Sequence, residues 1–186
     1  MCGIVGYIGD KKATPILING LLSLEYRGYD SAGIAVLDNN KIAVMKNKGR
    51  VNNLYDIDGI NDLLGNIGIA HTRWATHGKP SKENSHPHMD NSNTFAVVHN
   101  GIIENYTEIR NFLENKGYNF LSQTDTEVIP NLIHYYYENG INLSVFGNLL
   151  FGLFPGPFYG VISDYNYTIL LLKKFMPNPG GGLFFS

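Results

Sequence analysis

The chain opens with MCGIVGYIGD (residues 1–10), in which a cysteine directly precedes a run of small and β-branched residues. Residues 3–8 predict a buried β-strand, because such residues pack well on an enclosed, pleated surface. Cys2 is the only cysteine in the 186 residues. A thiol at a chain terminus is open to oxidation. Cys2 is therefore either a chemical group that must stand at the terminus or a small apolar side chain on the first strand.

Removal of Met1 would make Cys2 the first residue and leave it with a free α-amino group. The pKa of an α-amine is about 8, so part of it is unprotonated near neutral pH. One residue would then provide both the nucleophile and its general base, which is the arrangement of enzymes with an N-terminal nucleophile. This chemistry would explain the position of the thiol.

Working outward from this strand, the sequence predicts alternating strands and helices. Apolar residues at helical spacing predict a helix over 13–24, and residues 33–47 are typical of a hairpin that turns at 38–40. Residues 74–93 lack apolar periodicity, and a loop of this length tends to be functional. We also expect short helices over 50–65, strands over 67–73 and 94–101, helices over 105–116 and 126–138, and a strand pair over 158–164 and 168–174.

Capping patterns precede the last two of these helices, namely Asn105 with Glu108 and Thr124 with Glu127. Several neighbouring strands are expected to pair in the antiparallel sense, and few of them alternate cleanly between apolar and polar residues. Both faces of the sheets are therefore expected to be buried. The predicted fold class is α+β, with antiparallel sheets packed face to face and helices outside.

The composition excludes several classes of function. Sixteen acidic and 14 basic residues give a net charge of -2, which provides no basic surface for nucleic acid or an anionic membrane. A single cysteine excludes an internal disulfide framework. No stretch approaches the roughly 20 apolar residues of a membrane span, and glycines and charges interrupt the first apolar run too early for a signal peptide. We expect a cytoplasmic protein that binds neither nucleic acid nor membrane.

Six motifs follow one another in residues 1–128: MCGIVGYIG, LEYRGYDSAGIAV, IAHTRWATHG, HPH, VVHNGIIENY and SQTDTEV. Together they resemble the glutaminase domain of the class II glutamine amidotransferases, which belong to the N-terminal-nucleophile hydrolases. Within that group the resemblance is closest to the glucosamine-6-phosphate synthases, also called glutamine–fructose-6-phosphate aminotransferases. The resemblance implies a four-layer α/β/β/α sandwich of antiparallel sheets. It also implies hydrolysis of L-glutamine to glutamate and ammonia through a Cys2 thioester, without a cofactor.

The resemblance assigns catalytic roles to three residues. Cys2 is the nucleophile, and the Asn100 side chain and the Gly101 backbone N–H form the oxyanion hole. Such preorganised donors stabilise the charge that develops on the amide oxygen during attack. Gly101 would also let the backbone approach the substrate closely.

The remaining site residues follow from the same resemblance. A guanidinium fork suits the substrate carboxylate and a carboxylate suits its α-ammonium, roles that fall to Arg73 and Asp125. Two of these residues, Trp74 and Gly28, also have a purely structural interpretation. A lone tryptophan is often a core residue, and a glycine often marks a tight turn. The covering loop of the site would contain Trp74, Thr76 and His77, and Arg27 and Gly28 would brace the nucleophile.

The resemblance also describes the organisation of the protein. Residues 1–186 would form a type-2 glutamine amidotransferase domain that is truncated at its C-terminal end, with the isomerase domains absent. In the full-length enzyme the isomerase domain would be its partner, and ammonia would convert fructose-6-phosphate to glucosamine-6-phosphate. The sequence does not decide whether the protein forms a homodimer. The alternative is an inactive or regulatory glutamine-binding fragment, because a retained Met1 would hold the amine of Cys2 in a peptide bond.

Histidines raise the alternative of a metal site. His86 and His88 flank a proline, but their spacing fits no standard zinc pattern and no carboxylates cluster nearby in the sequence. We therefore expect no metal site. We expect His71, His99 and His134 to be structural side chains with satisfied hydrogen bonds.

Overall fold

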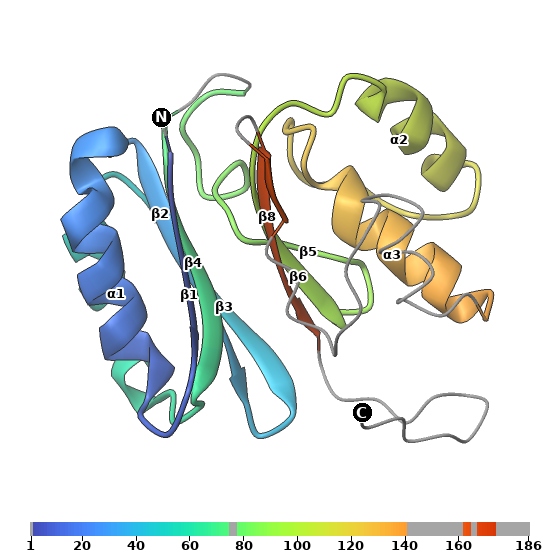
Figure 1. Ribbon diagram of the computed structural model, residues 1–186. Helices are drawn as coiled ribbons and strands as arrows, with labels where there is room; N and C mark the ends of the chain where they lie inside the picture. The colour runs from blue at the N-terminus through green and yellow to red at the C-terminus, as the bar shows by residue number, and fades with distance from the viewer. Residues whose placement is uncertain (1, 75–77, 141–161, 165–166, 174–186) are drawn as a thin grey trace.

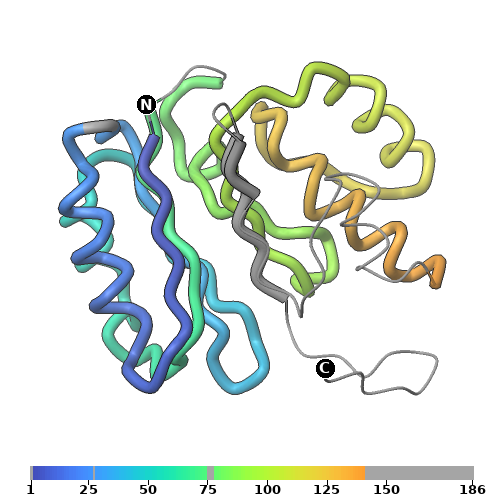
Figure 2. Tube along the Cα trace, viewed as in Figure 1, coloured from blue at the N-terminus to red at the C-terminus, as the bar shows by residue number. Residues whose placement is uncertain are grey.

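The structure, a computed structural model, describes residues 2–74, 78–140, 162–164 and 167–173. Two four-stranded antiparallel sheets pack face to face, with helix α1 outside one sheet and helices α2 and α3 outside the other (Figure 1). This arrangement confirms the predicted α+β class and its four layers. The tube in Figure 2 shows that the chain up to β4 builds one side of the sandwich, and the chain from β6 to α3 lies on the other.

The first sheet has the strand order β1-β4-β2-β3, in which every neighbouring pair is antiparallel. The predicted strand 3–8, helix 13–24 and strand 67–73 are confirmed with those bounds, and short 3-10 helices occupy the region predicted for them. The elements of this half are β1 Gly3–Ile8, α1 Ala13–Leu24, η1 Glu25–Arg27, β2 Ser31–Asp38, β3 Lys41–Lys48, η2 Val51–Asp56, η3 Ile60–Asp62 and β4 Ile67–Arg73.

The second sheet has the order β5-β6-β8-β7 and is also antiparallel. The polar stretch 74–93, expected to be a loop throughout, contributes a two-residue edge strand to it. Parts of the predicted strands 158–164 and 168–174 lie outside the described residues. The elements of this half are β5 His88–Met89, β6 Phe95–Asn100, α2 Tyr106–Glu114, α3 Val128–Glu138, β7 Ile162–Asp164 and β8 Tyr167–Lys173.

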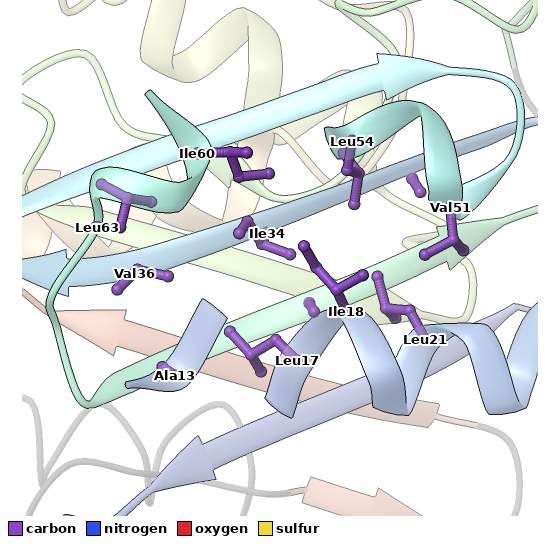
Figure 3. Packing of buried hydrophobic residues seen from close by; sticks show 12 residues of the cluster. Ala13, Leu17, Ile18, Leu21, Ile34, Val36, Val51, Leu54, Ile60 and Leu63 are labelled. Carbon is purple, nitrogen blue, oxygen red and sulfur yellow. The ribbon is translucent and has the colours of Figure 1, made fainter. Parts of the chain in front are cut away.

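An apolar layer lies between α1 and the first sheet (Figure 3). Leu17, Ile18 and Leu21 of α1 are fully buried and point toward Ile34 and Val36 of β2. The 3-10 helices close the layer from the side, because their apolar residues join the same cluster. Burial of a single side chain of this kind stabilises the fold by about 1.5–3 kcal/mol.

The central strands carry two apolar faces, which explains why they show little polar alternation. In β2, Ile34 belongs to the layer under α1, and Ala35 belongs to the cluster between the sheets. In β6, Val97 packs toward α3, and Val98 packs toward the first sheet. Successive side chains of a strand point to opposite faces, so both faces of these strands are covered.

Turns and helix ends agree with the sequence in part. The predicted hairpin turns at Asn39 and Asn40, whose positive φ values of 47° and 58° suit a two-residue turn. The capping predictions are wrong, since Asn105 and Glu127 stand at the N-caps of α2 and α3 without a side-chain capping bond. The Glu127 carboxylate instead accepts hydrogen bonds from the backbone N–H groups of residues 121 and 122.

Four chain segments meet at one end of the sandwich. Cys2 precedes β1, Arg73 ends β4, and Ser31 opens β2 opposite Arg73. Asn100 ends β6 on the facing sheet. Among the described residues, no helix has the length and apolar character needed to cross a membrane.

Candidate active site

The Cys2 thiol lies against the end of strand β4. Its Sγ accepts a hydrogen bond from the Trp74 N–H at 3.3 Å and lies 3.7 Å from the Trp74 carbonyl oxygen, toward which its S–H can donate. The pairing of β1 with β4 places Gly3 opposite Thr72, and the Gly3 N–H donates to Thr72 Oγ1 at 3.2 Å. The thiol is half-buried. Strand register therefore holds the candidate nucleophile at a fixed place, open to solvent on one side.

Gly28 supports this arrangement through its lack of a side chain. A Cβ at this position would lie 2.8 Å from the Arg73 carbonyl carbon and 3.0 Å from the Trp74 nitrogen. Its φ of -176° is extended, and its N–H donates to the Glu25 carbonyl oxygen at 3.0 Å at the end of η1, so the predicted tight turn is also present. Close approach of two backbones explains the glycine, and it places Gly28 behind the peptide that contacts Cys2.

Asn100 bridges the two sheets at the site. Its Nδ2 donates to the Cys2 carbonyl oxygen at 3.1 Å, and its Oδ1 lies 2.9 Å from His71 Nε2. Gly101 follows with a φ of 151°, in a region that residues with a side chain rarely adopt. Asn100, and with it the chain at Gly101, therefore lies against the backbone of the candidate nucleophile Cys2.

Buried histidine rings stand behind Asn100. His71 stacks on His86 with ring centroids 4.3 Å apart, and His86 contacts His88 edge-on at 4.6 Å. Burial lowers the pKa of His71 to about 4 and holds the pKa values of His86 and His88 well below the usual range. Neighbouring positive charges lower these pKa values further. All three rings are therefore neutral near pH 7.

Arg73 and Asp125 are both buried, with 5% and 7% of their surface exposed. Arg73 Nη2 donates to the Gly78 carbonyl oxygen at 3.2 Å. Asp125 Oδ2 accepts the Ile103 N–H at 2.7 Å. This bond ties the segment after Gly101 to the candidate ammonium ligand.

The loop after residue 77 is held against the segment that carries Asp125. The Gln123 N–H donates to Asn84 Oδ1 at 2.8 Å, and Asn84 Nδ2 donates to the Lys79 carbonyl oxygen at 3.0 Å. A Cβ at Gly78 would approach both Asn84 and Gln123. The contacts of Arg73 and Asp125 are therefore positioned by one connected loop structure.

Trp74 is a predicted loop residue whose side chain the structure describes. Trp74 is 48% exposed and meets the ring of Tyr29 edge-on at 5.3 Å, which excludes a core role for its indole. Thr76, His77 and the side chain of Arg27 lie outside the described residues.

No group of three or more histidine, cysteine or acidic side chains in the described part of the chain could hold a metal ion. His88 Nε2 instead lies 2.8 Å from Thr124 Oγ1, and His86 Nδ1 accepts the His99 N–H at 3.3 Å. These two ring nitrogens are thus used in hydrogen bonds within the protein. The buried His71 Nδ1 has no hydrogen-bond partner among the described residues, so the expectation of fully satisfied hydrogen bonds is wrong for that nitrogen.

Sequence patterns did not identify His71 as part of the site. The usable signal is the alternation of the strands. Ile69 and Val98 pack between the sheets, so His71 and Asn100, two residues further along β4 and β6, face each other. Strand alternation predicts this contact only once it is known which faces of the two sheets pack together.

Comparisons with known proteins agree with this geometry. Residues 71–168 match the family model described as "Glutamine amidotransferase domain". The chain is 64% identical over 141 residues to the glutamine–fructose-6-phosphate aminotransferase (isomerizing) of Clostridium perfringens, and 57% identical over 136 residues to that of Bacteroides thetaiotaomicron. These matches cover 76% and 73% of this chain but 23% and 22% of the relatives. The chain thus spans about a quarter of their length.

Two solved structures are also similar. One is a glutamine phosphoribosylpyrophosphate amidotransferase from B. subtilis, with a TM-score of 0.70 and 29% identity. The other is described as the allosteric regulatory enzyme of purine biosynthesis, with a TM-score of 0.71 and the same identity. Each match covers 94% of this chain and 35% or 36% of the solved one.

Proposed function

The chain belongs to the family of glutamine amidotransferase domains, and we propose that its site hydrolyses the side-chain amide of L-glutamine to glutamate and ammonia. The observation that carries the proposal is the position of Cys2. Its thiol contacts the end of β4, and its own carbonyl oxygen accepts a hydrogen bond from the Asn100 amide. Nucleophile and oxyanion donor thus meet in one place.

The proposed reaction has two halves. The α-amine of Cys2, freed by removal of Met1, takes the thiol proton, and the thiolate attacks the amide carbon of glutamine. The C–N bond then breaks, the nitrogen receives that proton and leaves as ammonia, and a glutamyl thioester remains on Cys2. Water then attacks the thioester and releases glutamate and the thiol.

Stabilisation of the negative charge that forms on the amide oxygen is assigned to Asn100 and Gly101. An amide nitrogen carries two N–H donors, and only one of those on Asn100 is used by the Cys2 carbonyl. The second can meet the substrate oxygen beside the Gly101 N–H. Loss of one such donor typically lowers kcat by about 10²–10³-fold.

Arg73 and Asp125 are assigned to the amino-acid end of glutamine. A buried guanidinium and a buried carboxylate of opposite charge suit the carboxylate and α-ammonium of the substrate. Asp125 Oδ1 lies 3.4 Å from the Thr126 hydroxyl; this long contact can give way to the ammonium. Trp74, Thr76 and His77 are assigned to the loop over the bound substrate, and Arg27 to support of the nucleophile.

We further propose that residues 1–186 act as the glutaminase domain of a longer cytoplasmic enzyme, whose isomerase domain uses the ammonia to convert fructose-6-phosphate to glucosamine-6-phosphate. This is supported by the similarity to glutamine–fructose-6-phosphate aminotransferases (isomerizing), of which the chain spans about a quarter. A homodimer is part of the same proposal, and the sedimentation of the full-length enzyme tests it.

The first test of the function is an intact mass before and after exposure to a diazo-ketone analogue of glutamine. The expected mass lacks Met1 and gains one adduct that excess glutamine prevents and that Cys2→Ala abolishes. Glutamate release should vanish in Cys2→Ala, whereas glutamine binding measured by calorimetry should remain. A processed chain that hydrolyses glutamine without Cys2 would overturn the mechanism. A retained Met1 with neither adduct nor turnover would favour the inactive glutamine-binding fragment.

A second test addresses the substrate clamp. Arg73→Ala should raise KM for glutamine by about 10- to 100-fold, because a charge-assisted hydrogen bond contributes about 1.5–3 kcal/mol. Arg50→Ala is the matched control, since the Arg50 side chain is 71% exposed and pairs with Glu25 across 3.9 Å. An unchanged KM in Arg73→Ala would remove Arg73 from the site.

A further inference from the structure

We propose that His71 is a positioning residue that fixes the orientation of the Asn100 amide, so that its N–H group faces the oxyanion. The proposal rests on the glutaminase function proposed above. It adds a residue that does not touch the substrate and acts only through the oxyanion donor.

The hydrogen bonds of Asn100 define which end of its amide faces which neighbour. The Cys2 carbonyl oxygen can only accept, so the group 3.1 Å from it is the Asn100 nitrogen. The Asn100 oxygen therefore faces His71 Nε2 at 2.9 Å, and that ring nitrogen must carry the proton. One donor on His71 and one acceptor on Cys2 together select a single orientation.

This selection matters because the two ends of an amide are nearly identical in shape. Rotation of the Asn100 amide by 180° would place its oxygen next to the reaction centre, where a negative charge develops. An acceptor at that position repels the oxyanion, whereas the nitrogen stabilises it. The orientation of one side chain thus decides whether the site favours or opposes the transition state.

His71 is held too firmly to follow a rotating Asn100. Its side chain is buried, with 1% of the residue exposed, and its ring lies 20° from parallel to the ring of His86. His86 in turn accepts the backbone N–H of His99, the residue before Asn100. The stack and the strand that carries the amide are therefore fixed to each other.

The charge state of the ring agrees with this role. Burial lowers the pKa of His71 to about 4, so the ring is neutral at the pH of the reaction. A neutral ring donates through Nε2 without placing a full positive charge behind the oxyanion hole and beside Arg73. The donor is thus a constant feature across the pH range in which the α-amine of Cys2 titrates.

The test compares two replacements of His71. His71→Phe keeps the shape of the ring and removes the donor, and it should lower kcat by about 10- to 100-fold with KM changed less than about threefold. His71→Gln can place an amide N–H where Nε2 stood, and it should recover most of kcat. If His71→Phe does not fold, His71→Asn takes its place, because its amide is too short to reach Asn100.

His88→Phe is the matched control. It makes the same replacement in the same buried stack and also removes one side-chain hydrogen bond, to Thr124. The two hydrogen bonds described for the Asn100 amide go to His71 and Cys2 and not to His88. We expect it to lower the melting temperature while kcat stays within about threefold of the wild type. Equal losses of kcat in His71→Phe and His88→Phe would reduce His71 to a packing residue.

A double-mutant cycle with Asn100→Ala separates action through Asn100 from any independent effect. If His71 acts only by orienting the amide, His71→Phe should cost nothing further once the amide is gone. Additive losses would overturn the proposal. Loss of turnover in Cys2→Ala together with full activity in His71→Phe would refute the positioning role and leave the glutaminase function standing.

Discussion

The layer under α1 and the end of the sandwich around Asn100 are both buried, but they are held together in different ways. Under α1 the contacts are apolar and come from side chains such as Leu17 and Ile34, which are fully buried. Around Asn100 the buried groups are histidines and hydroxyls joined by hydrogen bonds, as His71 is to Asn100 and His88 to Thr124. The stability of the layer under α1 depends on how completely side-chain volume fills it. The end around Asn100 depends on which hydrogen-bond donor faces which acceptor.

This difference indicates which substitutions should change the stability of the protein and which should change its activity. Apolar contacts are non-directional, so a change under α1 alters the free energy of unfolding and leaves the geometry of the site intact. A buried polar network is directional, and removal of one partner leaves another unsatisfied. Substitutions around Asn100 should therefore lower kcat more readily than they lower the free energy of unfolding.

The largest effect on stability is expected from Leu17→Ala. It removes a fully buried side chain from the layer under α1, which typically costs about 2–5 kcal/mol. Denaturant unfolding measures this loss, and kcat of the folded protein should not change. Leu64→Ala is the control, because Leu64 is 59% exposed. A large fall in kcat for Leu17→Ala would show that the two regions are not independent.

Gly28→Ala and Gly20→Ala form the next pair, because each introduces a crowded methyl group into one of the two regions. At Gly28 the new Cβ would lie 2.8 Å from the Arg73 backbone, whereas at Gly20 it would lie 2.9 Å from a Val5 methyl. Backbone displacement at the nucleophile should lower kcat/KM by about 100-fold.

Gly20→Ala should leave kcat/KM unchanged, since flexible methyl groups of the α1 layer can yield. Steady-state glutaminase assays on both variants measure the contrast. Similar activity losses in the two variants would contradict the separation of the regions.

The smallest effect concerns acid stability. The folded pKa of His88 is held well below the unfolded value of about 6.5, chiefly by burial. The unfolded chain therefore binds more protons below pH 6.5, and stability falls as the pH is lowered. From pH 6.5 to 5.5 one such histidine contributes a loss of about 1 kcal/mol.

His88→Phe should remove that contribution and flatten the decline of the unfolding free energy over this pH range. Chemical denaturation at pH 6.5 and 5.5 measures it, and Leu17→Ala should keep the wild-type pH dependence. An identical decline in wild type and His88→Phe would show that folding does not lower the pKa of His88.

Much of the fold could be predicted because it rests on local patterns. The period of apolar residues located α1 and the hairpin of β2 and β3, whereas the chemistry assigned to Cys2 from its position stays a prediction. The partners of Glu127 could not be predicted, because its carboxylate meets backbone donors rather than the helix end. The contact between His71 and Asn100 was missed for a similar reason, since the two residues lie 29 positions apart on different sheets.

The hydrogen bond between Asn100 and Cys2 joins residues 98 positions apart, and this separation has a consequence during synthesis. At about 5–20 residues per second, the ribosome exposes the thiol several seconds before it completes the strand that carries Asn100. A nascent chain can thus expose Cys2 and still lack the side chain that contacts it. Under the glutaminase function proposed above, such an unfinished chain would lack the proposed oxyanion donor and is expected to release no ammonia.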